Sequence, residues 1–417
     1  MSDRTRLSVL LLISTLPVMT GAVLSPALPA LRAAFGAGPE AQAWIRWVLT
    51  TPALFTAAGA PLAGTLADRF GRRPVLLASL LLFAGSGSAG ALLDSLPALT
   101  ASRAVLGLAA GGIGTAATTL IVDYYDDAQS RILGGQAAVM ALSAMVYTVL
   151  GGLLTDLSWR APFGIYLVGL AVLWPAATLL PEPAPPKEAP SESAAPEDPA
   201  PREAATGWGR IGLLYGLAFL GLAVFNLIRV ELPYVLRAMG LQSGFWIGIV
   251  LSGGTVTGAL GSFSYDRIQS RIGVPGTLAL ALGLFAVGFG TIAMAGTPHS
   301  ALLGVALAGG GMGLLVPSLS DGVGEAAPEA LRGRLMGSLS TLRNLGRFAS
   351  PVLAAPALAG TGTAAPFAGA ALLSGALALT LSGWATVCLL PGRTSNETVP
   401  PDLNRDRAST NASLCRT

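Results

Sequence analysis

Runs of about 20 mostly apolar residues recur along this sequence, and they limit the folds that are open to it. Only 11% of the residues are charged, whereas 52% are hydrophobic. A soluble domain usually carries about 25% charged residues. The chain therefore lacks the polar groups needed to cover a water-facing surface. Because a helix of about 20 apolar residues crosses the hydrocarbon of a bilayer, the composition predicts an all-α integral membrane protein.

Twelve of these runs are expected to form transmembrane helices. Residues 348–392 carry no charge, and we divide them at the sequence AGTGTAAP because one span cannot use the whole stretch. The expected spans are 7–29, 43–66, 74–93, 98–122, 133–156, 162–180, 211–235, 243–265, 274–296, 300–321, 335–359 and 365–390.

A segment rich in Pro, Ala and Glu, residues 181–209, divides the spans into six and six. Because this segment holds no apolar core, we expect a disordered cytoplasmic linker. The expected domains are a six-helix bundle over 1–180, the linker, a second six-helix bundle over 210–392, and a cytoplasmic tail over 393–417.

Basic residues are concentrated in alternate loops, which predicts the orientation of the spans. Arg4 and Arg6 precede the first span, and three Arg residues follow the second. Further Arg residues follow the even-numbered spans, whereas the loops on the other side hold few. This bias predicts a multi-pass protein of the cell membrane with both termini in the cytoplasm.

The two halves repeat each other. LADRFGRR after the second span recurs as SYDRIQSR after the eighth, and Asp68 matches Asp266 at an offset of 198. Asp123 and Asp321, at the ends of the fourth and tenth spans, match at the same offset. Two pseudo-symmetric six-helix halves related by a parallel repeat are a transporter architecture, with the substrate site at their interface near the bilayer midplane.

The motifs resemble those of the major facilitator superfamily over essentially the whole chain. GTLADRFGRR (64–73) is similar to that superfamily's motif between spans 2 and 3, and SRAVLGLAAGGIG (102–114) is similar to its span 4 motif. Together with DLSWRAPFGIYLVG (156–169), they resemble most the drug:proton antiporter branch with twelve spans. In one departure, Tyr147 and Thr148 occupy the Gly-Pro positions of that branch's span 5 signature, so the proline distortion is lost. This weakens the inference to antiport but not to transport.

The resemblance implies a secondary active transporter that works by alternating access. The leading interpretation is proton-coupled efflux of a small organic molecule, either drug-like or a metabolite. Metabolite uptake or uniport is an alternative, and a receptor or scaffold that moves no substrate is another. We expect no enzyme, cofactor, metal or nucleic acid, because the sequence pairs no nucleophile with a base and holds one His and two Cys. The expected partners are the substrate, protons and the bilayer, and the protein is expected to be a monomer.

Ionisable residues inside spans are expensive and indicate functional sites. Glu231 is either a proton-titrating carboxylate at the cavity mouth or a solvated acid at the outer interface. Arg103 either faces the cavity, as the resemblance implies, or is a structural hydrogen-bonder to the first span. Arg347 would lie about 18 Å along the eleventh span, close to mid-membrane. The proton-coupling and cavity candidates are Glu231, Arg103, Arg229, Asp321, Arg343, Arg347 and Arg46.

Arginines outnumber acids among these candidates, so the cavity is expected to be net positive. This favours a substrate with carboxylate or phosphate groups over a lipophilic cation. Arg343 and Arg347 lie four residues apart and share a helix face. They would either contact such a substrate or pair structurally with Asp68, Asp123 or Asp321.

The short charged loop after the second span is expected to be part of a cytoplasmic gate. Gly64 would permit close helix contact, Asp68 would lie near the N-terminus of the eleventh span, and Arg72 would pair with Asp123. Such a latch would close the cytoplasmic side when the cavity opens outward. It would be asymmetric, because Gln269 stands where the first copy has Gly71. The gate candidates are Gly64, Asp68, Arg69, Gly71, Arg72, Arg73, Asp123, Asp266, Arg267 and Arg271.

Overall fold

A computed structural model describes residues 3–125, 128–183, 207–358 and 364–389, and within these ranges the chain is helical with no strand. The first half consists of α1 (Asp3–Thr15), α2 (Met19–Ala22), α3 (Leu28–Phe35), α4 (Pro39–Phe70), α5 (Arg72–Ala89), α6 (Leu96–Tyr124), α7 (Gln129–Leu157), α8 (Ala161–Gly164) and α9 (Val168–Leu179). The second half consists of α10 (Trp208–Val230), α11 (Leu232–Ala238), α12 (Gly244–Ala293), α13 (Pro298–Ala326), α14 (Arg332–Leu358) and α15 (Ala365–Leu389). Most of the expected linker and the whole of the expected tail 393–417 lie outside the described residues.

Twelve spans in two six-helix bundles are confirmed. Eight described stretches are long and apolar enough to cross a membrane. One of these is α12, which holds two spans, and the less apolar α4, α5 and α14 complete the twelve.

Two expected boundaries were wrong. The eighth and ninth spans are not separated by an eight-residue loop, because the helix continues to a sharp turn at Gly273, where φ is 68°. Glycine has no Cβ and adopts this left-handed φ without strain. The first span is also interrupted, since α1 ends at Thr15 and a short 3-10 turn containing Pro17 follows. Proline cannot donate the backbone hydrogen bond that would continue the helix.

Each half has its own apolar core. In the first half Phe83 and Tyr166 are fully buried and pack edge to face, and in the second half Phe285 packs in the same way on Phe289. Glycines bring helices into backbone contact: a Cβ on Gly111 would lie 2.7 Å from the backbone nitrogen of Ala60 on α4. Small residues permit such close approach between membrane helices. Each bundle is therefore tightly packed within itself.

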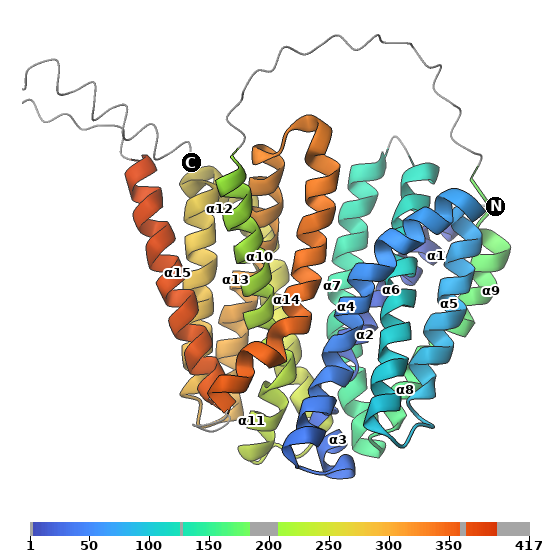
Figure 1. Ribbon diagram of the computed structural model, residues 1–417, viewed down its shortest axis with the longest axis horizontal. Coiled ribbons are helices and arrows are strands. Elements are labelled where there is room, and N and C mark those ends of the chain that lie inside the picture. The colour runs from blue at the N-terminus through green and yellow to red at the C-terminus, as the bar shows by residue number, and fades with distance from the viewer. Residues whose placement is uncertain (1–2, 126–127, 184–206, 359–363, 390–417) are drawn as a thin grey trace, which may run out of the picture.

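The two halves stand side by side with their long helices roughly parallel (Figure 1). We call the face where α9 ends and α10 begins the linker face; it is at the top of Figure 1. The opposite face carries α3 and α11 (Figure 1). Contacts between the halves join α4 to α14, α7 to α12 and α3 to α11. From the basic loops we propose that the linker face is cytoplasmic.

Candidate functional site

A cavity of about 1740 Å³ lies between the two halves. Its walls come from helices of both halves, chiefly α4, α6 and α7 on one side and α10, α12 and α14 on the other. The lining reaches Thr119 and Arg334, which are near the linker-face ends of α6 and α14. This position, between two bundles and deep in the membrane-spanning part, is where a transporter of this architecture holds its substrate.

Two arginines stand at the end of the cavity farthest from the linker face. Arg229 comes from α10 and Arg347 from α14, and both line the cavity. The Nη1 of Arg347 donates to the Oδ1 of Asn344 at 3.2 Å. Among the described residues no carboxylate forms an ion pair with either guanidinium, and no Asp or Glu lines the cavity. The end of the cavity is therefore cationic.

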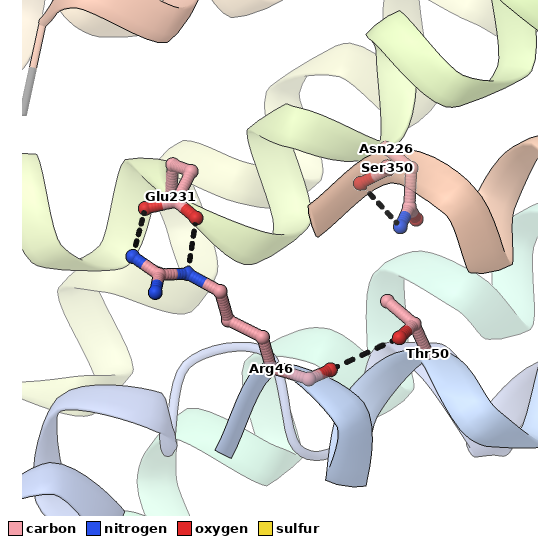
Figure 2. Close-up of polar contacts among 5 residues, drawn as sticks. All are labelled: Arg46, Thr50, Asn226, Glu231 and Ser350. Carbon is pink, nitrogen blue, oxygen red and sulfur yellow. Dashed lines mark hydrogen bonds and ion pairs between the residues drawn. The ribbon is translucent and has the colours of Figure 1, made fainter. Parts of the chain in front are cut away.

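The surroundings of these two arginines fix their positions. The side-chain amide of Asn226 donates to the backbone oxygen of Arg347 at 3.1 Å. It also donates to the hydroxyl of Ser350 at 3.3 Å (Figure 2). A Cβ on Gly21 would lie 3.0 Å from the Nη1 of Arg229, so a larger residue there would press on the guanidinium. Hydrogen bonds and close packing thus hold the arginines at the junction of the two halves.

Beyond the cavity, an ion pair joins the two halves. Arg46 donates from Nε to Oε1 of Glu231 at 2.6 Å and from Nη2 to Oε2 at 3.2 Å (Figure 2). Glu231 is 2% exposed and Arg46 is 16% exposed. The expectation of a solvated acid is therefore wrong. Neither side chain lines the cavity, so Glu231 lies in the closed interface rather than at a cavity mouth.

The opposite face is closed by further contacts between the halves. The hydroxyl of Ser25 donates to the backbone oxygen of Arg229 at 2.6 Å. The rings of Trp47 and Phe348 lie with their centroids 4.8 Å apart. Because these contacts seal one face while the cavity extends toward the other, the structure is open to the linker face.

One contact at the opposite face was not predicted from the sequence. The carboxylate of Asp156, at the end of α7, accepts hydrogen bonds from the Ser243 hydroxyl at 2.8 Å and from the backbone nitrogens of Gly244 and Phe245 at 2.5 and 3.1 Å. It thereby caps the first turn of α12 in the other half. An Asp near the end of one span and a Ser-Gly pair before another were the available signals, but the sequence does not show that they meet.

Glycines on α7 and α12 support the same interface. A Cβ on Gly152 would lie 2.1 Å from the backbone oxygen of Gly244, and a Cβ on Gly248 would lie 2.8 Å from that of Thr148. The backbones of α7 and α12 therefore touch here, although this chain lacks the Gly-Pro pair of the antiporter branch's span 5 signature. Tyr147, at one of those positions, shares a hydrogen bond of 2.8 Å with the Thr15 hydroxyl.

Three further cavity candidates, besides Arg46 and Glu231, lie outside the cavity. Arg103 is fully buried inside the first half, where it donates to the backbone oxygens of Ser86 and Gly87 at 3.0 and 2.7 Å. Arg103 therefore has the structural role rather than the cavity role, but its hydrogen bonds go to α5 and not to the first span, because α5 and the rings of Phe163 and Tyr166 enclose the guanidinium. Asp321 is exposed and accepts from the Tyr265 hydroxyl at 2.8 Å. Arg343 is half-buried and does not line the cavity.

The expected ion pair of the linker-face loop is present. The Nε of Arg72 lies 3.0 Å from the Oδ2 of Asp123. Asp123 therefore does not pair with Arg343 or Arg347. A carboxylate that the sequence did not single out completes this cluster: Glu182, just after α9, accepts from the backbone nitrogens of Arg72 and Arg73 at 2.7 and 2.9 Å. Arg73 also donates to the backbone oxygen of Ala177.

The other gate candidates make few contacts in this conformation. Gly64 has open space around it, so the expected close helix contact is not formed. Asp68 is exposed, and no hydrogen bond or ion pair to a described residue involves it. Arg69 lies against the ring of Phe70. Asp266, Arg267 and Arg271 are exposed on the continuous helix α12 rather than in a loop. This is the arrangement expected of a gate at an open face.

Comparison with known proteins identifies the family. A sequence model of the Major Facilitator Superfamily matches residues 10–351. The chain belongs to this superfamily. Its fold agrees: the xylose transporter of Escherichia coli in its inward-open conformation superimposes with a TM-score of 0.70 at 16% identity, over 98% of this chain and 100% of that one.

Relatives within the superfamily differ in their names and lengths. The tetracycline resistance protein, class G, of Vibrio anguillarum is 28% identical over 82% of this chain and 87% of that protein. The 3-(3-hydroxy-phenyl)propionate transporter of Escherichia coli is 28% identical over 81% of this chain and 85% of that protein. An uncharacterized transporter of Mycobacterium tuberculosis is 33% identical over 47% of this chain, which spans only 29% of that relative. The comparisons thus show the superfamily and the fold of this chain, and the relatives alone do not assign its substrate.

Proposed function

We propose that this transporter exports a small organic anion and that protons drive the export. The observation that carries the proposal is the pair of arginines, Arg229 and Arg347, at the end of a cavity that no described carboxylate lines. A guanidinium binds carboxylate, sulfonate or phosphate groups through paired, charge-assisted hydrogen bonds. In a membrane interior an unpaired charge is costly, so an anionic substrate would stabilise this end of the cavity.

Two relatives support export and an anionic substrate. One relative of nearly full length is named for tetracycline resistance, which is consistent with removal of a compound from the cell. Another is named for a phenylpropionate, whose carboxyl group is anionic at neutral pH. The cavity is open to the face that we propose to be cytoplasmic, where an exported substrate would bind.

The ion pair of Arg46 and Glu231 is the proposed site of proton coupling. Glu231 accepts two hydrogen bonds from Arg46, and an ionised carboxylate can accept both whereas a protonated one loses an acceptor and its charge. Protonation of Glu231 would therefore weaken the contact that closes the opposite face. Because a proton that reaches Glu231 from that face favours opening toward it, protons from outside would promote the step that opens the loaded cavity outward and releases the substrate.

Transport by purified protein in lipid vesicles tests the proposal. The anionic probe is benzenesulfonate, which stays charged at all working pH values, and the cationic probe is tetraphenylphosphonium. We expect benzenesulfonate to move toward the opposite face, and faster when that side is acidic. Arg347→Ala and Arg229→Ala should each slow this transport at least 10-fold. Arg160→Ala removes an arginine far from the cavity, at an exposed ion pair with Asp94, and should leave transport unchanged.

The possible results separate the alternatives. Faster transport of the cation, unaffected by Arg347→Ala, would overturn the anionic substrate. Benzenesulfonate transport at a rate that does not depend on the pH gradient would indicate a uniporter. Net movement toward the linker face under an acidic opposite side would indicate uptake. Movement of neither probe under any gradient would favour a receptor or scaffold.

A further inference from the structure

Four large hydrophobic side chains that line the cavity are also highly exposed: Leu142 is 60% exposed, Val256 48%, Leu260 61% and Phe263 81%. Leu142 lies on α7 and the other three lie on α12. Among the described residues, every exposed large hydrophobic side chain of the cavity wall belongs to these two helices. The seam between α7 and α12, where two helices of different halves meet, therefore differs from the rest of the wall.

The seam is closed at one end and open at the other. At the opposite face the backbones touch, since a Cβ on Gly152 would lie 2.1 Å from the Gly244 oxygen. From Gly248, which still contacts α7, to Phe263 the helix rises about 22 Å at 1.5 Å per residue. Over this distance the residues of α12 change from interface contacts to cavity lining. The two helices thus diverge toward the linker face and leave a wedge in that half of the membrane.

The second seam, between α4 and α14, has a different lining. On α14 the cavity residues are polar, charged or glycine, for example Ser338, Thr341 and Asn344. On the matching stretch of α4 they are Thr, Ala and Pro, for example Pro52, Thr56 and Ala60. The exposed hydrophobic residues of α4, such as Leu62 and Phe70, do not line the cavity. The α4–α14 seam therefore suits water and polar groups, whereas the α7–α12 seam suits the hydrocarbon of a lipid tail.

We infer that the α7–α12 seam is a lateral entrance through which an amphiphilic organic anion passes from the lipid leaflet of the linker face into the cavity. The occupant has an apolar tail, which stays against Leu142, Val256, Leu260 and Phe263 while its anionic head reaches Arg229 and Arg347. A water-filled cavity gains nothing from such exposed apolar side chains, whereas a lipid-dissolved tail covers them. The charge complementarity at the end of the cavity selects an anionic head. This inference rests on the proposed function, whose substrate it narrows.

A matched pair of probes with one head group tests the entrance. Benzenesulfonate is soluble in water, and 4-octylbenzenesulfonate carries the same permanent charge but dissolves in the bilayer. In vesicles with wild-type protein we expect the octyl compound to be transported faster at equal total concentration. Leu260→Asn combined with Phe263→Asn should lower its rate at least 5-fold and slow benzenesulfonate much less, because the polar seam disfavours the apolar tail whereas Arg229 and Arg347, which bind the head group, are unchanged.

A control variant distinguishes the seam from a general effect of polar residues in the membrane. Leu372 and Leu379 are 76% and 75% exposed on α15 and do not line the cavity. Leu372→Asn combined with Leu379→Asn should leave both rates unchanged. If the seam variant slows both probes equally, or neither, the lateral entrance is overturned while anion transport stands. If wild-type protein moves neither anion, the proposed function and the entrance are overturned together.

Discussion

Arg46 and Glu231 are 185 residues apart in the sequence, yet they form a two-point ion pair that joins the halves of the transporter beyond the end of its cavity. Glu231 is almost completely buried there. Removing one partner of a buried ion pair commonly costs about 3–5 kcal/mol, because the other charge is left unpaired. The pair therefore contributes strongly to the conformation in which the linker face is open.

Glu231→Gln tests the proposed coupling. Glutamine keeps the shape of the side chain but carries no charge and binds no proton. We expect transport driven by a pH gradient to fall at least 10-fold, whereas exchange of labelled for unlabelled anion across vesicles without a gradient continues. Gradient-driven transport at the wild-type rate would show that Glu231 does not couple protons to substrate.

The Asp68→Asn variant tests whether Asp68 acts in the cytoplasmic gate or only supports the folded structure. Asp68 is exposed and makes no ion pair with a described residue in this conformation, so we expect its loss to leave expression and Tm unchanged. If Asp68 contacts the N-terminus of α14 when the linker face closes, the same change should abolish transport. Rates near wild type would exclude the latch.

Gly71→Ala tests the loop before α5. Gly71 has φ 92° and ψ 158°, a region that only glycine populates readily, and its missing Cβ would lie 2.7 Å from the Glu182 carboxylate. Such backbone strain costs about 1–3 kcal/mol. We expect a lower Tm in detergent. Adding Glu182→Ala should recover only the part of the loss that is due to the steric contact. A Tm equal to that of wild type would mean that the loop relaxes freely.

Several features were predictable because they are local or repeated. The apolar runs gave the spans, since each crosses the bilayer by itself. The repeat of LADRFGRR and the matching Asp123 predicted the ion pair of Arg72, because both residues lie at the same end of neighbouring spans. Arg347 was placed deep in the membrane by counting residues along its helix, and it lines the cavity there.

Other features depend on how the two halves meet, which a single sequence does not encode locally. The resemblance favours a cavity position for Arg103, but α6 directs this side chain into the first half against Phe163 and Tyr166. Composition predicts that Glu182 belongs to the linker, but its carboxylate accepts a hydrogen bond from the first backbone nitrogen of α5. The partner of Glu231 comes from another bundle. Rotation of helices and pairing between bundles are set by packing, not by periodicity.

Asp156 provides a test of how the opposite face is held closed. Its carboxylate accepts three hydrogen bonds from Ser243, Gly244 and Phe245, all in the other half. Loss of a helix cap costs about 0.5–2 kcal/mol, which changes an equilibrium between two conformations roughly 2- to 30-fold. Asp156→Ala should therefore shift the population toward the state that is open at the opposite face.

Distances between spin labels on α3 and α11, measured in lipid discs by pulsed electron resonance, report this shift. We expect a longer-distance population in Asp156→Ala that is rare in wild type. Asp94→Ala is the matched control, because Asp94 is an 80% exposed acid whose ion pair with Arg160 stays within the first half. Identical distance distributions in Asp156→Ala and wild type would mean that the ion pair of Arg46 and Glu231 closes this face without help from the cap.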